Sequence, residues 1–522
     1  MEVYFKQHVE SQQFELHSMD MLSGFTNISY LYYFANCNKS KQFIKLELVR
    51  DSFFKALLDF PLLAGRISID GKSGRASIVV DKGNLNMPEY AESKSVLSYE
   101  QLRNAGFGWN MLPSSLFSAG TVPRANKHGE LKMAHVNVLE LRDNSGIVLF
   151  VSIPHYAVDG VGYCAFMEHW SLLCRCLHEQ KPVANNKIPK VFSFDRCTID
   201  ASLPENRSAL DSLTHSLYAD SSYLSQFMSW LSPEKRGTLL STVSSLEAIE
   251  GHVFYLSARS LALLRENICK ALANDNNNSS DSYSSNSVRL SDNDMITSLA
   301  SIVVAQGATA DLSPDNSFNS NNGKNRLLLA YQSVKQKIFS RLQNFVTPVD
   351  TSDHWTTSIV VDARCRLKQI AETKYTGNAV FVVPILRNLN DVHYQAIDKA
   401  TASLAMAIRN MVSHIDGSKI AQVVDIVSQT PQSYMNSLAN SILNSKKVVV
   451  SNQSRFPLYS VDFGFGCPEW ISPIPAFYAN FVSILPKSAE LNGYHIYITT
   501  SKGTMQQILA NKSWLEYACL VY

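Results

Sequence analysis

His155 stands where an apolar stretch ends and a turn begins, a position from which an imidazole can face a cavity. Residues 147–153 read Ile-Val-Leu-Phe-Val-Ser-Ile and end at Pro154. His155 then opens the pattern H-x-x-x-D-G, which is completed by Asp159 and Gly160. Imidazole titrates near neutral pH, so it can accept a proton from a hydroxyl or amine that attacks a carbonyl. We therefore take His155 as the candidate general base of an acyl-transfer reaction.

The H-x-x-x-D pattern does not identify an enzyme when it is taken alone. A lone histidine beside an apolar strand is more often a satisfied core residue, and Asp159 and Gly160 also suit an ordinary turn. A second motif, D-F-G-F-G at residues 462–466, resembles the magnesium loop of kinases, but no H-R-D-x-x-x-x-N loop precedes it. The chain also lacks a G-x-S-x-G nucleophile elbow, a P-loop and a dinucleotide fingerprint. Kinases, serine hydrolases and nucleotide-binding enzymes are therefore disfavoured.

The composition indicates a folded protein without an electrostatic preference for nucleic acid. Among 522 residues, 47 Lys and Arg balance 45 Asp and Glu, which leaves a net charge of +2. No apolar run is long enough to span a membrane, and the N-terminus lacks the pattern of a signal peptide. The nine cysteines form no zinc-binding pattern. We expect a cytoplasmic monomer that binds neither nucleic acid nor a metal and is not an integral membrane protein.

Alternating strand and helix patterns predict an α/β fold with a sheet and helices in each half. In the first half the predicted strands are 67–69, 76–80, 133–141 and 147–153, and the predicted helices are 43–58 and 164–177. The last two strands should be antiparallel neighbours, because residues 142–146 are rich in turn formers. In the second half the predicted strands are 252–256, 326–331, 357–362, 379–385, 446–451, 481–485 and 495–500. The predicted helices there are 260–271, 294–306, 396–412, 420–443 and 505–517.

Segments of weak periodicity predict the domain organisation. We expect an N-terminal domain over residues 1–215, a crossover linker over 216–245 and a C-terminal domain over 246–522. Two segments rich in Asn, Asp and Ser, near 274–288 and 311–325, cannot bury apolar surface and are predicted to be disordered insertions.

Several short motifs follow one another in a fixed order between residues 60 and 505. Besides H-x-x-x-D-G and D-F-G-F-G they include P-L-L-A-G-R at 61–66, S-D-N-D at 291–294, D-A-R-C-R at 362–366, Y-T-G-N at 375–378 and R-F-P-L-Y at 455–459. The tail, residues 493–505, adds a strand and a methionine-bearing helix. In this order the motifs resemble those of the BAHD acyl-CoA-dependent acyltransferases. That transferase family also includes fungal trichothecene O-acetyltransferases.

The resemblance implies a fold and a reaction. The fold would be of the chloramphenicol-acetyltransferase-like type, with two similar domains and an active-site channel at their interface. Acyl-CoA would be a co-substrate, with no permanently bound cofactor, and a small alcohol or amine would be the acceptor. His155 would take the proton from the acceptor as it attacks the thioester, without a covalent acyl-enzyme.

The resemblance also implies roles for residues around His155. Asp159 would pair with Arg364 and hold the His155 loop in shape, and Gly160 would leave room for the CoA arm. The late motif would be structural, through Asp462, Gly464 and Gly466.

Two departures from the family pattern leave the substrate open. Phe465 stands where most plant members have Trp. The family's Thr-Ser-Trp segment corresponds to Ser451-Asn452-Gln453, so Ser451 or Asn452 is the candidate hydrogen-bond donor to the oxyanion. One alternative is a non-catalytic member of the same fold that binds acyl-CoA or a small ligand. A peptide-synthetase condensation domain is less consistent, because Pro154 replaces the first histidine of its doubled pair.

Overall fold

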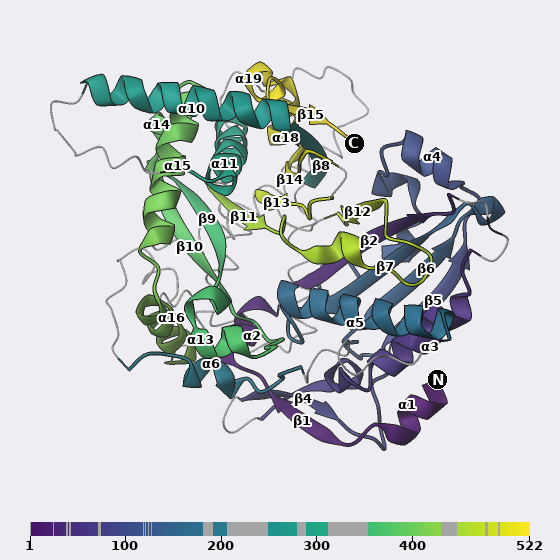
Figure 1. The fold of residues 1–522 in the computed structure, drawn as a ribbon. Helices are drawn as coiled ribbons and strands as arrows, with labels where there is room; N and C mark the ends of the chain where they lie inside the picture. Colours follow the sequence, from purple (N-terminus) through teal and green to yellow (C-terminus); the bar gives the residue numbers. More distant parts are fainter. Residues whose placement is uncertain are drawn as a thin grey trace, which may run out of the picture.

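A computed structural model describes most of the chain. The described residues are 2–24, 26–37, 40, 43–70, 75–117, 119–120, 122–123, 125–126, 128–180, 192–205, 249–278, 289–311, 353–429, 446–475, 479–488 and 491–522. Figure 1 shows a sheet with helices in the N-terminal half, coloured purple to blue, beside a second sheet with helices formed by later residues. The predicted α/β class is confirmed.

The five-stranded sheet contains the strand that leads to His155. Its order is β12 (Trp470–Pro473), β2 (Asn27–Ala35), β7 (Gly146–Pro154), β6 (His135–Glu140) and β5 (Glu89–Lys94). The strands predicted on either side of residues 142–146 are confirmed as antiparallel neighbours, β6 and β7. Every residue of β7 is buried, and its side chains alternate between two cores. The run before His155 is continuously apolar because neither of its faces meets solvent.

Two long helices of this half pack against each other over the sheet. They are α3 (Leu46–Ala56) and α5 (Gly160–His178), and α5 crosses the strands in Figure 1. Both confirm predicted helices, although α5 begins earlier than expected because Asp159 caps it, accepting hydrogen bonds from the next backbone N–H groups. The shorter helices are α1 (Glu2–His8), α2 (Ser18–Ser23), α4 (Tyr99–Asn104) and α6 (Cys197–Ala201). Single 3-10 turns occur at Pro61–Ala64, Trp109–Met111, Ser114–Phe117 and Arg142–Asn144.

A separate three-stranded antiparallel sheet has the order β1-β4-β3. Its strands are β1 (Gln12–Glu15), β3 (Arg66–Ile69) and β4 (Ala76–Val80). The last two confirm the predicted pair of strands at 67–69 and 76–80.

The seven-stranded sheet belongs to the second half of the chain. Its order is β10 (Val380–Asn388), β9 (His354–Asp362), β11 (Lys447–Asn452), β13 (Phe481–Ile484), β14 (Gly493–Ser501), β8 (Ile249–Ser257) and β15 (Ala518–Leu520). β11 is parallel to β9 and β13, and the other pairs are antiparallel. The remaining helices are α10 (Ala258–Asn278), α11 (Asp292–Asp311), α13 (Lys368–Glu372), α14 (Leu389–His393), α15 (Ile397–Ser413), α16 (Gly417–Gln429), α18 (Lys502–Ala510) and α19 (Lys512–Leu515). Further 3-10 turns lie at Arg364–Arg366 and Pro457–Ser460.

The structure corrects three expectations in this half. α10 continues to Asn278, into the segment predicted to be disordered, because extending a formed helix costs little per residue. α16 includes Gly417, since the side chain of Asp416 accepts a hydrogen bond from Lys419 N and so caps a helix rather than ending one. The predicted helix 505–517 is divided at Asn511, which ends α18, caps α19 and precedes the edge strand β15.

Some expectations fall outside the described residues. They concern the strand 326–331, the linker 216–245, the helix beyond residue 429 and the insertions beyond residues 278 and 311. The proposed domain boundaries therefore stay a prediction. Among the described residues, no helix combines the length and the hydropathy needed to cross a membrane.

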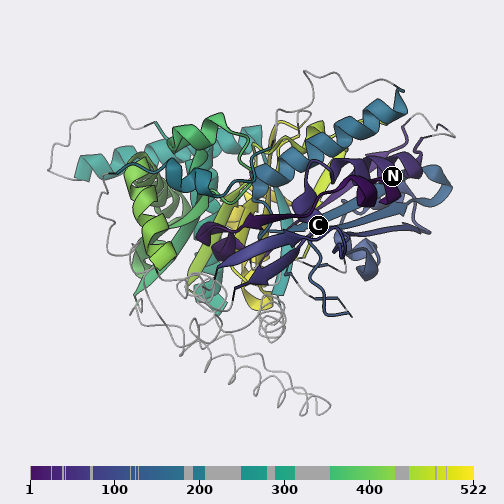
Figure 2. The same cartoon turned by 90° about the horizontal axis from the view of Figure 1, so that it is seen from below.

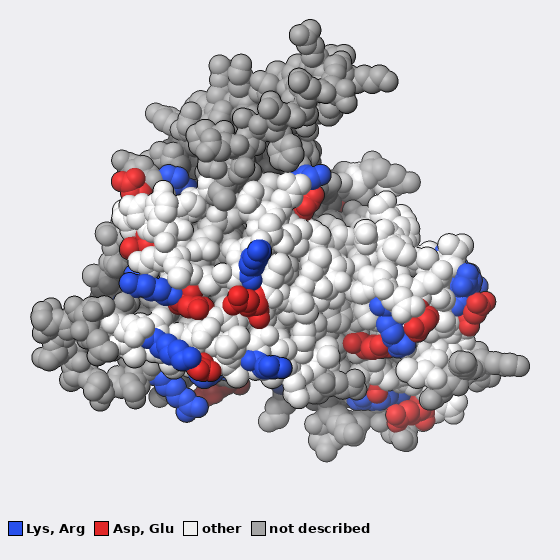
Figure 3. All heavy atoms as spheres, turned by 90° about the horizontal axis from the view of Figure 1, so that it is seen from above, with Lys and Arg blue, Asp and Glu red and all other residues white. Residues whose placement is uncertain are grey.

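The N-terminal and C-terminal halves of the chain share a sheet and a hydrophobic core. β12, although late in the chain, pairs with β2 and so extends the N-terminal sheet. A third core combines side chains from both halves, among them Phe150, Val253 and Tyr497. Viewed from below in Figure 2, the two sheets lie side by side under their helices. On the face drawn in Figure 3, acidic and basic side chains are interspersed across a largely uncharged surface.

Candidate active site

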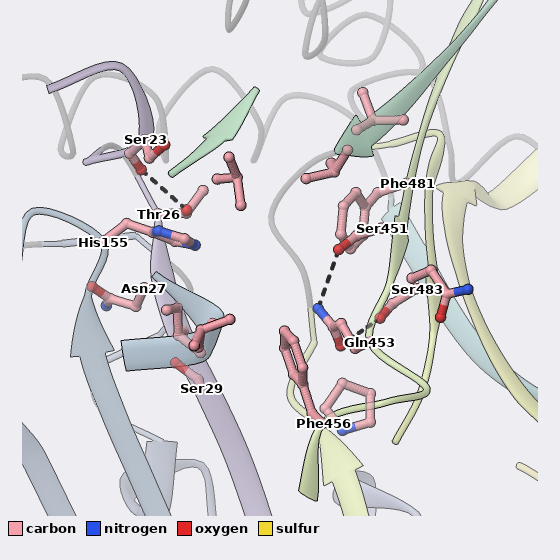
Figure 4. Close-up of a pocket in the computed structure, with 18 of the residues that line it drawn as sticks. Ser23, Thr26, Asn27, Ser29, His155, Ser451, Gln453, Phe456, Phe481 and Ser483 are labelled. Carbon is pink, nitrogen blue, oxygen red and sulfur yellow. Dashed lines mark hydrogen bonds between the residues drawn. The ribbon is translucent and has the colours of Figure 1, made fainter. Parts of the chain in front are cut away.

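A cavity of about 320 Å³ lies between the two halves and is reached by His155. In Figure 4 one wall carries His155, Thr26, Asn27 and Ser29, and the facing wall carries Ser451, Gln453, Phe456, Phe481 and Ser483. Asp362 is the only Asp, Glu, Lys or Arg among the described residues that line it. The cavity therefore suits an uncharged, partly apolar guest.

The second wall is one face of the seven-stranded sheet. Side chains two residues apart on a strand point to the same side, and strand pairing brings such residues into register. Helices of the C-terminal half pack on the sheet's other face (Figure 1). The cavity-lining members of this face are Val360, Asp362, Val380, Val382, Val449, Ser451, Phe481, Ser483 and Tyr497.

The imidazole of His155 is held in one orientation by Asn378. His155 Nδ1 lies 2.9 Å from Asn378 Oδ1, and Asn378 Nδ2 donates to the backbone oxygen of His155 at 2.6 Å. An amide oxygen only accepts, so Nδ1 is the donor and Nε2 carries the lone pair. The backbone N–H of His155 donates to Thr26 O at 2.9 Å. The ring thus presents an acceptor nitrogen to the cavity.

Burial lowers the pKa of His155 below its ordinary value of 6.5, and this effect outweighs three opposing ones. The hydrogen bond with Asn378 and the negative charges of Asp159 and Asp20 act to raise the same pKa. His155 is therefore neutral at neutral pH, as a general base must be.

Asp20 is a residue of this site that the sequence pattern did not identify. Its carboxylate is fully buried, and its Oδ1 accepts from both Asn378 N at 3.0 Å and Asn378 Nδ2 at 2.8 Å. Its Oδ2 accepts from His17 N at 2.9 Å and lies 3.2 Å from Arg196 Nε. The available signal was the spacing of His17 and Asp20, a capping box at the start of α2.

Asp159 and Arg364 form a buried bidentate ion pair. Arg364 Nη1 lies 2.6 Å from Asp159 Oδ2, and Nη2 donates to Asp159 Oδ1 at 3.0 Å. Asp159 also accepts from the N–H groups of Val161 and Gly162 at the start of α5, and from Ala379 N. The carboxylate ties α5 to the loop that carries Asn378. The structure thus brings Asp159 and Arg364 together, as the sequence analysis expected.

Gly160 lies under the ring of Phe456. A Cβ atom at Gly160 would lie 2.4 Å from Phe456 Cζ and 2.7 Å from Cε2. Phe456 is itself part of the cavity wall. A side chain at residue 160 would therefore meet an aromatic ring of the protein, and the room for a CoA arm expected at Gly160 stays a prediction.

Ser451 and Asn452, which end β11, and Gln453, which follows it, make different contacts. Ser451 lines the cavity, and its Oγ receives a long contact of 3.5 Å from Gln453 Nε2. Asn452 donates to Asn293 Oδ1 and accepts from the N–H of Ser454. Gln453 Oε1 accepts from Tyr30 and Ser483 hydroxyls, both at 2.7 Å, and so links the two walls. Of the two candidate oxyanion donors, Ser451 is the one whose side chain is less engaged.

The loop at residues 462–466 lies outside the cavity. Asp462 Oδ1 accepts from the N–H groups of Gly464 and Gly466 at 2.8 and 3.0 Å. Both glycines adopt positive φ, +102° and +103°, a region that other residues rarely occupy. Asp462 also lies 3.6 Å from Arg175 of α5. None of these residues is among those that line the cavity.

Two aromatic side chains of this loop pack against the N-terminal core. Phe463 lies 4.9 Å from the ring of Trp170, and Phe465 lies 5.1 Å from that of Phe34. Phe465 therefore contributes an aromatic packing contact to this core.

Fold and cavity together define a two-lobed α/β protein with a neutral histidine at the interface of its halves. A family model described as the Transferase family matches residues 3–229 and 331–515. Because the match covers most of the chain, this protein belongs to that family, the BAHD-type acyltransferases. The predicted family and the acyltransferase class are confirmed. Among curated proteins, no sequence matches the chain.

Solved structures share the fold at low sequence identity. The structure of F. graminearum TRI101 with coenzyme A and T-2 mycotoxin superposes with a TM-score of 0.65 and 16% identity, covering 98% of this chain and 100% of that chain. TRI3 trichothecene 15-O-acetyltransferase from Fusarium sporotrichioides gives 0.54 and 12%, covering 97% and 95%. Vinorine synthase gives 0.53 and 12%, covering 96% and 95%. The expected chloramphenicol-acetyltransferase-like architecture is confirmed.

Proposed function

We propose that this protein transfers an acyl group from acyl-CoA to a hydroxyl or amine of a small-molecule acceptor, with His155 as general base. The observation that carries the proposal is the setting of His155. Its ring lines the cavity, Nδ1 is held by Asn378, and no described residue hydrogen-bonds to Nε2. The TRI101 structures that contain coenzyme A support CoA as the carrier of the acyl group.

The proposed reaction needs no covalent acyl-enzyme. The acceptor O–H or N–H donates to His155 Nε2, and its oxygen or nitrogen attacks the thioester carbonyl as the proton passes to the imidazole. The tetrahedral intermediate then expels CoA thiolate, which recovers the proton from the imidazolium. A base positioned in this way contributes about 10²–10⁴-fold to the rate.

Ser451 is the proposed donor to the oxyanion. It lies on the wall opposite His155 (Figure 4), so a carbonyl held between them has the base on one side and a hydroxyl on the other. A well-placed donor of this kind contributes about 2.7–4 kcal/mol to transition-state stabilisation. Asn452 is the weaker candidate, because Asn293 and Ser454 occupy its amide.

The proposed roles of the supporting residues follow from their contacts. Asp159 and Arg364 hold the turn after His155 against the Asn378 loop. Asp462, Gly464 and Gly466 shape a loop against α5 and the N-terminal core. A cytoplasmic location and a monomeric state remain part of the proposal.

The first experiment is a thiol-release assay. Purified protein is incubated with acetyl-CoA, a longer aliphatic acyl-CoA or an aromatic acyl-CoA, each with a panel of alcohols and amines, and free CoA is measured. His155→Ala should lower kcat by at least 10²-fold at unchanged melting temperature. His414→Ala, which alters an exposed histidine on a distant helix end, should turn over normally. Full activity of His155→Ala would refute the proposal, and acyl-CoA binding without turnover would favour the non-catalytic alternative.

A further inference from the structure

Three hydrogen bonds determine which way the Asn378 amide faces. Its two N–H groups point at acceptors: Asp20 Oδ1 at 2.8 Å and the backbone oxygen of His155 at 2.6 Å. Its oxygen is left for His155 Nδ1 at 2.9 Å. A flipped amide would bring its oxygen against the Asp20 carboxylate and its NH₂ against His155 Nδ1. Two acceptor oxygens would then oppose each other in a buried site, which is costly.

The orientation of the amide decides the tautomer of the imidazole. With Oδ1 facing Nδ1, the ring must carry its proton on Nδ1, and Nε2 is free to accept one. With the amide reversed, Nδ1 would accept and Nε2 would hold the proton. The second tautomer cannot act as a base toward the cavity.

We propose that Asp20 is a positioning residue for the reaction: acting through Asn378, it selects the His155 tautomer that can accept the substrate's proton at Nε2. The inference rests on the proposed function of His155 and adds a residue that does not touch the cavity. Asp20 is not among the residues that line it.

The anchoring of Asp20 matches this role. Besides Asn378, its carboxylate accepts from His17 N, and Arg196 lies 3.2 Å from Oδ2. Arg196 also donates to the oxygen of Ala157, in the turn that follows His155. Asp20 and Asn378 are 358 positions apart, so the tautomer depends on contact between the two halves of the chain.

The test removes the charge without leaving another one buried. Asp20→Asn alone leaves the buried charge of Arg196 without its partner. It is therefore compared with the double variant Asp20→Asn/Arg196→Met, in which both side chains are uncharged. A single amide oxygen cannot accept from His17 N, Asn378 N and Asn378 Nδ2 together. In both variants the Asn378 amide keeps the backbone oxygen of His155 as an acceptor but no longer faces a carboxylate, so its preference for one orientation is weakened.

Two readouts separate positioning from a purely structural role. In selectively ¹⁵N-histidine-labelled protein, the His155 signals, assigned as those absent from His155→Gln, should show a proton on Nδ1 in the wild type and a mixture of tautomers in both Asp20 variants. The rate kcat should fall about 10–100-fold, the range found when a partner that orients a metal-bound histidine is lost.

The acid limb of kcat/KM should move to lower pH in both variants, because the negative charge of Asp20 acts to raise the pKa of His155. The charges of Asp159, Arg364 and Asp362 are unchanged, whereas the double variant also removes the positive charge of Arg196, so its shift should be the smaller of the two. The control is Asp294→Asn, which alters another buried carboxylate paired with an arginine, Arg409, and should lower only the melting temperature.

The outcomes are distinct. Wild-type tautomer, kcat and pH profile in the double variant would overturn the role of Asp20, even with His155→Ala inactive. Restored activity in the double variant relative to Asp20→Asn would likewise overturn it, because stability alone would explain the loss. If His155→Ala remained fully active, the proposed function would fail, while the NMR readout would still decide whether Asp20 selects the tautomer.

Discussion

Replacing Gly160 with alanine tests how tightly the cavity wall is packed against the helix that follows His155. The new Cβ would lie 2.4 Å from Phe456 Cζ, whereas carbon atoms in contact prefer about 3.5–4.0 Å. The ring must therefore retreat by about 1 Å. Gly160 is the first residue of α5 and is not among the glycines with positive φ, so alanine meets no backbone strain.

Two opposing free-energy terms set the expected stability change. Alanine in place of glycine favours a helix by up to about 1 kcal/mol. Overpacking costs about 1–3 kcal/mol, at the low end when a ring can shift. The net destabilisation should lie between about 0 and 2 kcal/mol. The effect on activity should be larger, about 10–100-fold in kcat/KM, because a displacement of about 1 Å in an active-site wall is costly.

The assay is a double-mutant cycle with Phe456→Leu, which removes the ring atoms nearest to the new methyl group. Thermal unfolding and kcat/KM are measured for both single variants and the double variant. Phe456→Leu should rescue part of the Gly160→Ala defect, with a coupling of at least 0.5 kcal/mol. Gly417→Ala is the matched control: it is also a first helical residue, but its Cβ would meet neighbours at 3.5 Å or more.

An additive cycle would refute this reasoning. An increase in KM for acyl-CoA that is the same in both backgrounds would instead support the interpretation that Gly160 leaves room for the CoA arm.

Three further predictions concern the ion pair, the base and the oxyanion donor. Asp159→Asn should lower the free energy of unfolding by about 3–5 kcal/mol, since Arg364 would stay buried without its partner; loss of activity at an unchanged melting temperature would contradict a bracing role. The kcat/KM profile should lose activity as pH falls through the pKa of His155, with a midpoint below 6.5, because burial lowers that pKa and only the neutral ring accepts a proton; a midpoint above 6.5 would count against it. Ser451→Ala should lower kcat about 10²–10³-fold and Asn452→Ala much less, as measured by thiol release; the reverse order would assign the oxyanion to Asn452.

Local sequence patterns were sufficient to predict those elements whose conformation depends mainly on their own residues. The strand β7 could be read as a continuous apolar run, and the turn that ends it placed His155 at a strand exit. The order of the short motifs was sufficient for the family, because each preserves a local shape that survives sequence divergence.

The strand β2 was missed for a physical reason. Its sequence, Asn-Ile-Ser-Tyr-Leu-Tyr-Tyr-Phe-Ala, mixes polar and aromatic residues, so it shows neither an alternation of polar and apolar side chains nor an aliphatic run like that of β7. β12 was missed because its four residues become a strand only by pairing with β2. Both strands hold the cavity wall that carries Asn27 and Ser29 against the other half of the chain.

The sequence by itself determined that a histidine at a strand exit, followed by a capped helix, could serve an acyltransferase. Only the tertiary structure decided what makes that histidine a base. Asp20 reaches Asn378 across 358 positions, and Phe456 rests on Gly160 from nearly 300 positions away. Such contacts depend on the packing of two sheets against each other, and nothing in the spacing of residues along the chain records which side chains that packing brings together.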